Sequence, residues 1–244
     1  MSDSAIDVDI HTEETEPLAL IPVEPSADTR FRLPDLVRDR VMVDVIHAGN
    51  VVPAAYLVDG KGRRISPTRF HGAYVRERDW GAPLVARALV ALLGLPGYYR
   101  VKIARTLLDF GRFPGVTPHG ARHTERLAIN QPFADLLSHP QKRRLLAETY
   151  DSISNAMEGA VHGKLIKIAI HTYDRFSPSG AERPEFSVIT RSEGIERERP
   201  GYITAFDPLY PRELGEFTAD PVLRDRISLT LQKKGLFVEP NYPY

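Results

Sequence analysis

The chain contains no cysteine. This absence excludes disulfides, thiolate metal sites and a cysteine nucleophile, and it leaves histidine, carboxylate and water as the plausible metal ligands. No apolar run reaches the roughly 18 residues that a transmembrane helix requires. The N-terminus also lacks the basic and apolar regions of a signal peptide. We therefore expect a cytoplasmic protein without a membrane partner.

Net charge is also absent, because 32 Lys and Arg residues balance 32 Asp and Glu residues. The balance hides an asymmetry. Eight of the acids lie between Met1 and Asp28, where there is no Lys or Arg, so the rest of the chain is basic. Its arginines are dispersed and are not interleaved with aromatic residues, which argues against nucleic-acid binding. Arginines that line a pocket for an anionic substrate are the more specific interpretation, and ordinary solubility is the simpler one.

The 244 residues, 42% of them hydrophobic, are enough for one large core. Segments typical of strands and helices alternate, which predicts an α/β domain with a mixed, mostly parallel sheet flanked by helices. We expect residues 1–33 to form a flexible acidic tail, because Ser, Thr, Pro and acids outnumber apolar residues there, and residues 34–244 to form the domain. The expected strands are 41–47, 98–103, 165–170, 186–190 and 236–238, and the expected helices are 79–93, 132–158 with a break near Pro140, and 221–234.

Two of these strand-like runs end in histidine. Val41–Ile46 is followed by His47, and Leu165–Ile170 is followed by His171. Ligands of open α/β sheets collect at the carboxyl ends of strands, and imidazole is a common zinc ligand. The pattern indicates that both histidines belong to one metal site, although a lone histidine at a strand end is more often a hydrogen-bonded structural residue.

Five blocks, taken in order, resemble the N-formylglutamate amidohydrolase family from about Val41 to Tyr244. The family is similar in fold to zinc carboxypeptidases and aspartoacylase, and its members cleave the amide of N-acylated amino acids. The matching blocks are Ile46-His-Ala-Gly-Asn-Val-Val-Pro53, Asp79-Trp-Gly-Ala82, Arg105-Thr-Leu-Leu-Asp-Phe-Gly-Arg112, His171-Thr172 and Asn241-Tyr-Pro-Tyr244.

The resemblance implies a zinc ion held by His47, Asp79 and His171, with Glu77 as the alternative carboxylate. Zinc would supply a nucleophilic water at neutral pH, since it lowers the pKa of bound water to about 7. Asp79 has a second interpretation, because an Asp immediately before a predicted helix is also typical of an N-cap.

The resemblance also assigns the arginines. Arg105 is suited to polarising the scissile carbonyl and Arg112 to gripping the substrate carboxylate, with Asp109 orienting one or both of them. A plain surface salt bridge with Asp109 is the simpler alternative. Asn50 and Asn241 lie in matching blocks and are assigned to substrate binding. His119 and His123 lie in a Pro- and Gly-rich loop and are expected on the rim of the site.

Two departures from the family pattern affect the expected activity. Gly111 stands where relatives usually have Asn, which removes one polar contact to the substrate. The chain also stops at Tyr244, before a strand that bears a catalytic glutamate in the family. Glu239 is our candidate for that role and Glu158 is a further possibility, although neither matches a motif.

The resemblance therefore implies a zinc-dependent amidohydrolase that acts on a small N-acyl amino acid, for example an N-formyl amino acid, or on a related carboxylate-bearing substrate. The alternative is a catalytically impaired or partner-dependent homologue that binds an acyl amino acid or peptide without turnover. A homo-oligomer is compatible with either prediction.

Overall fold

The computed structural model describes residues 10, 12, 16–112, 127–177, 179–189 and 220–239. The chain divides into two compact units, Met1–Thr172 and Tyr173–Tyr244. Within the described ranges, the first unit contains the sheet, every helix except α8 (Pro221–Lys233), and the side chains His47, Asp79 and His171 of the site described below. No helix in the described part of the chain combines the length and hydrophobicity that crossing a bilayer requires.

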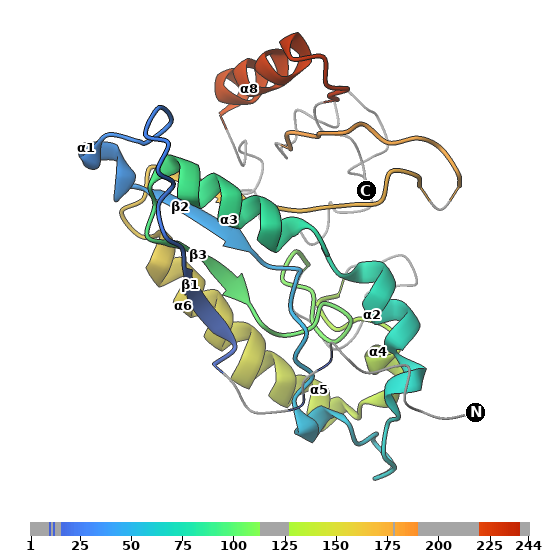
Figure 1. The fold of residues 1–244 in the computed structure, drawn as a ribbon. Coiled ribbons are helices and arrows are strands. Elements are labelled where there is room, and N and C mark those ends of the chain that lie inside the picture. Colours follow the sequence, from blue (N-terminus) through green and yellow to red (C-terminus); the bar gives the residue numbers. More distant parts are fainter. Residues whose placement is uncertain are drawn as a thin grey trace. The chain divides into compact units, whose positions relative to one another are not determined.

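A mixed sheet of four strands forms the centre of the first unit (Figure 1). The strand order is β1-β3-β2-β4; β2 runs parallel to β3 and β4, whereas β1 is antiparallel to β3. The predicted α/β class, with a mixed and mostly parallel sheet flanked by helices, is confirmed. The strands are β1 (Leu18–Pro22), β2 (Val41–Val45), β3 (Gly97–Val101) and β4 (Ile166–Ala169).

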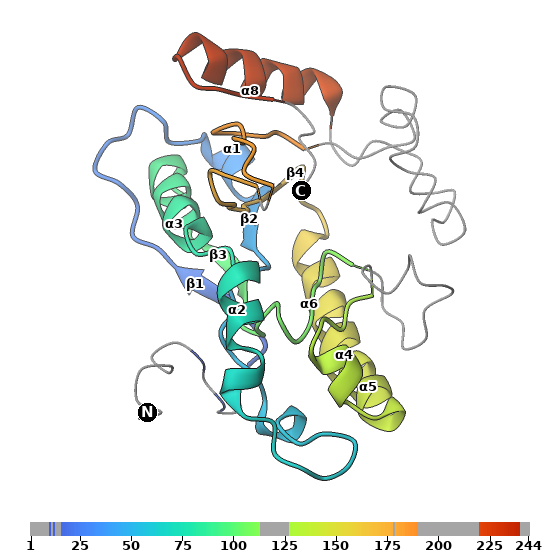
Figure 2. The ribbon, with the colours of Figure 1, turned by 90° about the vertical axis from the view of Figure 1, so that its right-hand side faces the viewer.

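Helices cover both faces of this sheet. On one face, Val43 and Val45 of β2 pack in a buried cluster with Ala86 and Val90 of α3. On the other face, Leu18 and Val101 share a second cluster with residues of the helical segment that ends in α6 (Figures 1 and 2). The helices of the unit are α1 (Asp35–Arg38), α2 (His71–Glu77), α3 (Ala82–Leu93), α4 (Phe133–Leu136), α5 (His139–Leu145) and α6 (Asp151–Val161), with short 3-10 turns at Ala54–Tyr56 and Pro67–Arg69.

Strand β1 corrects our expectation for residues 18–22 within the segment 1–33. We predicted a flexible acidic tail, but the apolar run that begins at Leu18 pairs along its whole length with β3, from Leu18 opposite Val101 to Pro22 opposite Gly97. The composition of residues 18–22 explains the difference. Apolar residues are concentrated in this short part of the segment, and pairing with β3 buries Leu18.

Helix boundaries differ from the predictions in two places. The helix expected from Asp79 begins at Ala82, with Gly81 as its N-cap, and it ends as predicted at Gly94, which adopts the left-handed conformation with φ 70°. The helix expected over 132–158 is divided. A capping box between Ser138 and Gln141 starts α5 at His139, and a π-helical turn over Leu146–Tyr150 joins α5 to α6.

The second unit contains one helix, α8 (Pro221–Lys233), among its described residues. Asp220 caps it by accepting hydrogen bonds from the backbone N–H groups of Val222 and Leu223, and Gly235 follows it with φ 84°. The strands expected at 186–190 and 236–238 are reduced to a single parallel bridge between Phe186 and Val238, with residue 190 outside the described part.

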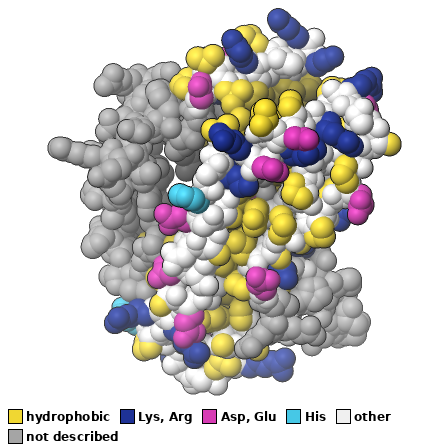
Figure 3. Space-filling model, turned by 90° about the vertical axis from the view of Figure 1, so that its left-hand side faces the viewer, with side chains coloured by type: hydrophobic (Ala, Val, Ile, Leu, Met, Phe, Trp, Pro, Cys, Tyr) yellow, Lys and Arg dark blue, Asp and Glu magenta, His cyan; other side chains and the backbone are white. Residues whose placement is uncertain are grey.

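Charged side chains of both signs reach the surface. On the face drawn in Figure 3, basic and acidic side chains lie among hydrophobic ones. Several large apolar side chains of α3 are exposed, including Leu84 and Val85. The buried face of α3 is formed instead by the small residues Ala82 and Ala86 together with Val90, which lets the helix approach the sheet closely.

A candidate metal centre between two strand ends

The register of the sheet brings the two predicted histidines together. Asp44 of β2 pairs with Ala169 of the parallel strand β4, so His47 and His171 follow at nearly the same level. Their ring centroids lie 4.8 Å apart. The predicted convergence of two residues more than 120 positions apart follows from the parallel pairing of their strands.

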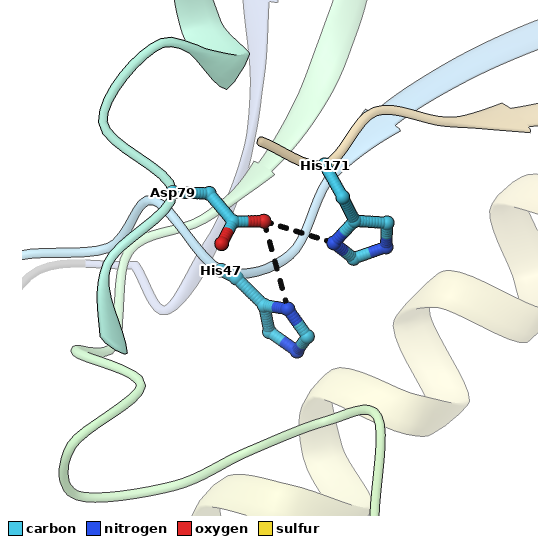
Figure 4. Close-up of side chains that lie close together, drawn as sticks. All are labelled: His47, Asp79 and His171. Carbon is cyan, nitrogen blue, oxygen red and sulfur yellow. Dashed lines mark hydrogen bonds and ion pairs between the residues drawn. The ribbon is translucent and has the colours of Figure 1, made fainter. Parts of the chain in front are cut away.

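Asp79 joins the two imidazoles from the connection between α2 and α3. Its backbone N–H donates to the carbonyl oxygen of His47 at 3.0 Å, which fixes the connection beside the end of β2. Its Oδ2 lies 2.9 Å from Nδ1 of His171 and 3.7 Å from Nδ1 of His47 (Figure 4). One carboxylate oxygen therefore faces both histidines.

Asp79 does not cap α3, the alternative role that the sequence left open. Gly81 occupies the N-cap position, and no side chain caps the helix. The side chain of Asp79 is only 5% exposed and is directed to the histidines. Glu77, the alternative ligand, is instead hydrogen-bonded through Oε2 to Nδ2 of Asn130 at 3.0 Å.

Three side chains, His47, Asp79 and His171, offer ligand atoms that all lie within 4.8 Å of one another. Bond lengths of about 2.0–2.1 Å in a tetrahedral zinc site place ligand atoms about 3.3 Å apart, so a small closure of these side chains would complete such a site. The donor set of two imidazoles and one carboxylate suits zinc, and three protein ligands leave a position open in the manner of catalytic zinc sites.

The protonation of His47 also fits a metal ligand. Its Nε2 lies 2.8 Å from Oδ1 of Asp109, and an ionised carboxylate can only accept a hydrogen bond, so Nε2 carries the proton. Burial lowers the pKa of His47, although the hydrogen bond to Asp109 opposes that effect. The neutral ring therefore has its lone pair on Nδ1, which is buried and has no hydrogen-bond partner among the described residues. A buried nitrogen lone pair without a hydrogen-bond donor or a metal ion beside it destabilises the fold.

Asp109 contacts His47 and both arginines of the site. Oδ1 accepts hydrogen bonds from His47 Nε2 and from the backbone N–H of Gly111, and Oδ2 lies 3.0 Å from Nε of Arg105 and 3.1 Å from Nε of Arg112. Burial alone would raise the pKa of Asp109. The hydrogen bond from His47 and the two guanidinium charges outweigh burial, and the pKa lies far below its usual range.

Arg105 and Arg112 are therefore in salt bridges with Asp109, as one interpretation of the sequence held, and they also border the triad. Nη1 of Arg105 lies 3.6 Å from Oδ1 of Asp79. The side chains of Arg105 and Arg112 are 25% and 32% exposed, so both remain accessible while their Nε atoms are anchored to one buried oxygen. Two fixed, accessible cations beside a candidate metal centre suit an anionic ligand.

Close backbone packing shapes the turn after His47. A Cβ atom on Gly49 would lie 2.1 Å from the carbonyl oxygen of Ile103, so only glycine fits where the chain crosses the end of β3. Arg78 and Arg100 both donate to the carbonyl oxygen of Ala48, at 3.3 and 2.9 Å. These contacts hold the backbone that carries His47, and no sequence motif indicates a role for the two arginines.

The other predicted site residues have different outcomes. Asn50 follows this turn, and its backbone N–H donates to Lys102 at 2.9 Å; its role in substrate binding stays a prediction. Glu239 belongs to the second unit, where its backbone N–H donates to Phe186, and its catalytic role also stays a prediction. Glu158 is exposed on α6. Asn241, His119 and His123 lie outside the described residues.

Sequence reasoning missed Asn130, a buried side chain beside the arginines. It lies in no recognisable motif, and only the folded structure brings it to Arg112, 18 residues before it. Comparison of the chain with protein-family models, with curated proteins and with solved structures gave no significant match.

Proposed function

We propose that the chain is a zinc-dependent amidohydrolase that cleaves the amide of a small N-acyl amino acid, such as an N-formyl amino acid, with a zinc carboxypeptidase-like arrangement of its site. The observation that carries the proposal is the bare Nδ1 of His47, which lies beside Asp79 and His171 and whose opposite ring nitrogen is fixed by Asp109. A carboxylate that orients a histidine from its far side is a regular companion of zinc sites.

His47, Asp79 and His171 would hold the zinc ion, which when bound activates water and polarises a carbonyl group. Arg105 lies 3.6 Å from Asp79 through Nη1, and its fixed charge suits an oxygen that gains negative charge during amide cleavage. Arg112 is the more exposed of the two arginines and suits the carboxylate of the substrate.

Glu77 is our candidate for proton transfer beside these groups. Burial raises its pKa, while the charges of Arg105 and Arg112 oppose the rise. Its Oε2 accepts a hydrogen bond from Nδ2 of Asn130, which also contacts Arg112, so this carboxyl group lies beside the arginines, where general acid–base work is needed. Glu239 is the alternative, on the grounds given by the sequence.

A second candidate function is binding of an acyl amino acid without turnover. It is favoured by the pairing of the three acids that the structure describes at the site in the first unit. Asp79 is paired with His171, Asp109 with His47 and both arginines, and Glu77 with Asn130. An acid that keeps such a partner throughout is less available to accept a proton.

The test combines metal analysis with an activity assay. Purified protein is dialysed against zinc, its metal content is measured, and hydrolysis of N-formyl and N-acetyl amino acids is followed. We expect one zinc per chain with turnover, and loss of both in His171→Ala. His162→Ala, which changes an exposed histidine after α6, is the matched control and should keep both. Zinc binding and tight acyl amino acid binding without turnover would favour the second function, and failure to bind zinc would contradict both.

A further inference from the structure

Asn130 connects three parts of the site through one side chain. Its Oδ1 accepts a hydrogen bond from Nη1 of Arg112 at 2.7 Å, and its Nδ2 donates to the carbonyl oxygen of Arg105 at 2.7 Å and to Oε2 of Glu77 at 3.0 Å. The residue is 5% exposed. If the amide were turned over, its NH2 group would face the N–H donor of Arg112, and its oxygen would face the oxygens of Glu77 and Arg105. Neither arrangement forms hydrogen bonds, so the partners define the amide orientation.

Arg112 is held at both of its ends. Its guanidinium contacts Asp109 through Nε and Asn130 through Nη1. Its backbone carbonyl accepts a hydrogen bond at 2.9 Å from the hydroxyl of Tyr150, whose ring stacks on Phe110. Tyr150 belongs to the π-helical turn between α5 and α6, a type of helix irregularity that frequently occurs at functional sites.

The two contacts of the guanidinium have different consequences. Asp109 anchors Arg105, Arg112 and His47 together, so it cannot set the direction of Arg112 alone. Among the described residues, Arg112 is the one whose guanidinium bonds to the side chain of Asn130. A neutral amide can also link the acid Glu77 to the cation Arg112 without adding charge to a region that already holds three acids.

We propose that Asn130 is a positioning residue that sets the direction in which Arg112 presents its guanidinium, and that it thereby determines preference for substrates with a free carboxylate. The inference rests on the proposed function, since it assumes that Arg112 grips the substrate anion. A guanidinium that is already fixed loses less freedom when it pairs with a carboxylate, so its contribution to affinity depends on its supports.

The experiment compares two probes that differ in one charged group, N-acetyl-L-leucine and N-acetyl-L-leucinamide, on the zinc-loaded full chain. Affinity is measured by calorimetry as Kd, or as KM where a probe is hydrolysed. We expect the wild type to prefer the acid. Asn130→Ala should reduce that preference about tenfold, the effect of one hydrogen bond to a charged group, while affinity for the amide and zinc content stay unchanged.

A double-mutant cycle separates positioning from general support of the fold. In an Arg112→Ala background, Asn130→Ala should have no further effect on acid preference. Gln131→Ala is the matched control, because that neighbouring side chain bonds to Asp135 and not to the site, and it should behave as wild type. If circular dichroism shows that Asn130→Ala does not fold, Asn130→Ser, which keeps a small polar group, takes its place with the same expected outcome.

Two kinds of failure are distinguishable. In the first, the wild type prefers the acid while Asn130→Ala weakens the affinity for both probes equally, or adds its full effect to that of Arg112→Ala. Either result would make Asn130 a structural residue and overturn this inference, while the proposed function would stand. If the zinc-loaded wild type shows no preference for the acid, or binds neither probe, the proposed function fails and the inference falls with it.

Discussion

His47 and Asp109 are joined by a hydrogen bond of 2.8 Å between Nε2 and Oδ1, across 62 residues of sequence. Both side chains are almost wholly buried. The bond orients the imidazole and leaves its other nitrogen bare toward Asp79 and His171. The candidate metal centre therefore depends on a residue that is not one of its ligands.

Removal of the charge of Asp109 should weaken zinc binding. In Asp109→Asn, His47 loses its charged acceptor, and we expect zinc affinity to fall about 10- to 100-fold, as is typical when the partner of a metal-binding histidine is changed. Trp80 is the only tryptophan and follows Asp79 directly, so its fluorescence can report a zinc titration. Asp151→Asn, an exposed acid of α6, is the control. Equal affinities in the two variants would contradict the role of Asp109.

Stability of the zinc-free protein should fall in acid because of Asp109. Its folded-state pKa lies below that of an unfolded aspartate, about 3.9, so its ionised form stabilises the fold above about pH 4. This contribution is lost as pH falls below about 4 toward the folded-state pKa. Urea unfolding at pH 7, 4 and 3 should show a steeper loss in the wild type than in Asp109→Asn. Parallel curves would show that Asp109 is not linked to the acid transition.

Gly49 should not tolerate a side chain. Gly49→Ala places a Cβ against the backbone oxygens of Ile103 and Lys102, at 2.1 and 2.5 Å, and backbone cannot move aside as a flexible side chain can. We expect the free energy of unfolding to fall by about 3 kcal/mol or more. Gly159→Ala in α6, where a Cβ meets nothing within 4 Å, is the control and should be neutral or stabilising by up to about 1 kcal/mol. Similar thermal unfolding of Gly49→Ala and wild type would refute this packing.

The two arginines should affect different kinetic constants. Arg105→Ala should lower kcat about 100- to 1000-fold, the usual loss when a partner of a developing negative charge is removed. Arg112→Ala should mainly raise KM, by about 10- to 100-fold, through the loss of a charged contact with the substrate. Arg144→Ala removes an exposed arginine that pairs with Glu148 on the helix surface and should change neither constant. Identical effects of the first two changes would indicate that they only support Asp109.

The sequence was sufficient to predict that His47 and His171 lie together. Two apolar runs that end in His47 and His171 indicated parallel strands, and parallel strands of one sheet place their carboxyl ends together. The end of α3 at Gly94 could also be predicted from neighbouring residues alone, since a glycine after an apolar helical stripe is typical of a left-handed C-cap.

The parts that could not be predicted depend on tertiary contacts. The pairing of β1 with β3 requires a partner about 80 residues away, and the short apolar run of β1 resembles many loops. Asn130, Arg78 and Arg100 contribute hydrogen bonds that exist only after the sheet and its connections have formed. The N-cap of α3 falls at Gly81, and the side chain of Asp79 contacts His171 instead of capping the helix.

Anomalous scattering at the zinc edge, from crystals grown with zinc, tests the central claim most directly. The account predicts one peak within about 2.3 Å of Nδ1 of His47, an oxygen of Asp79 and a ring nitrogen of His171. A zinc-containing crystal with no peak among these three side chains would contradict it.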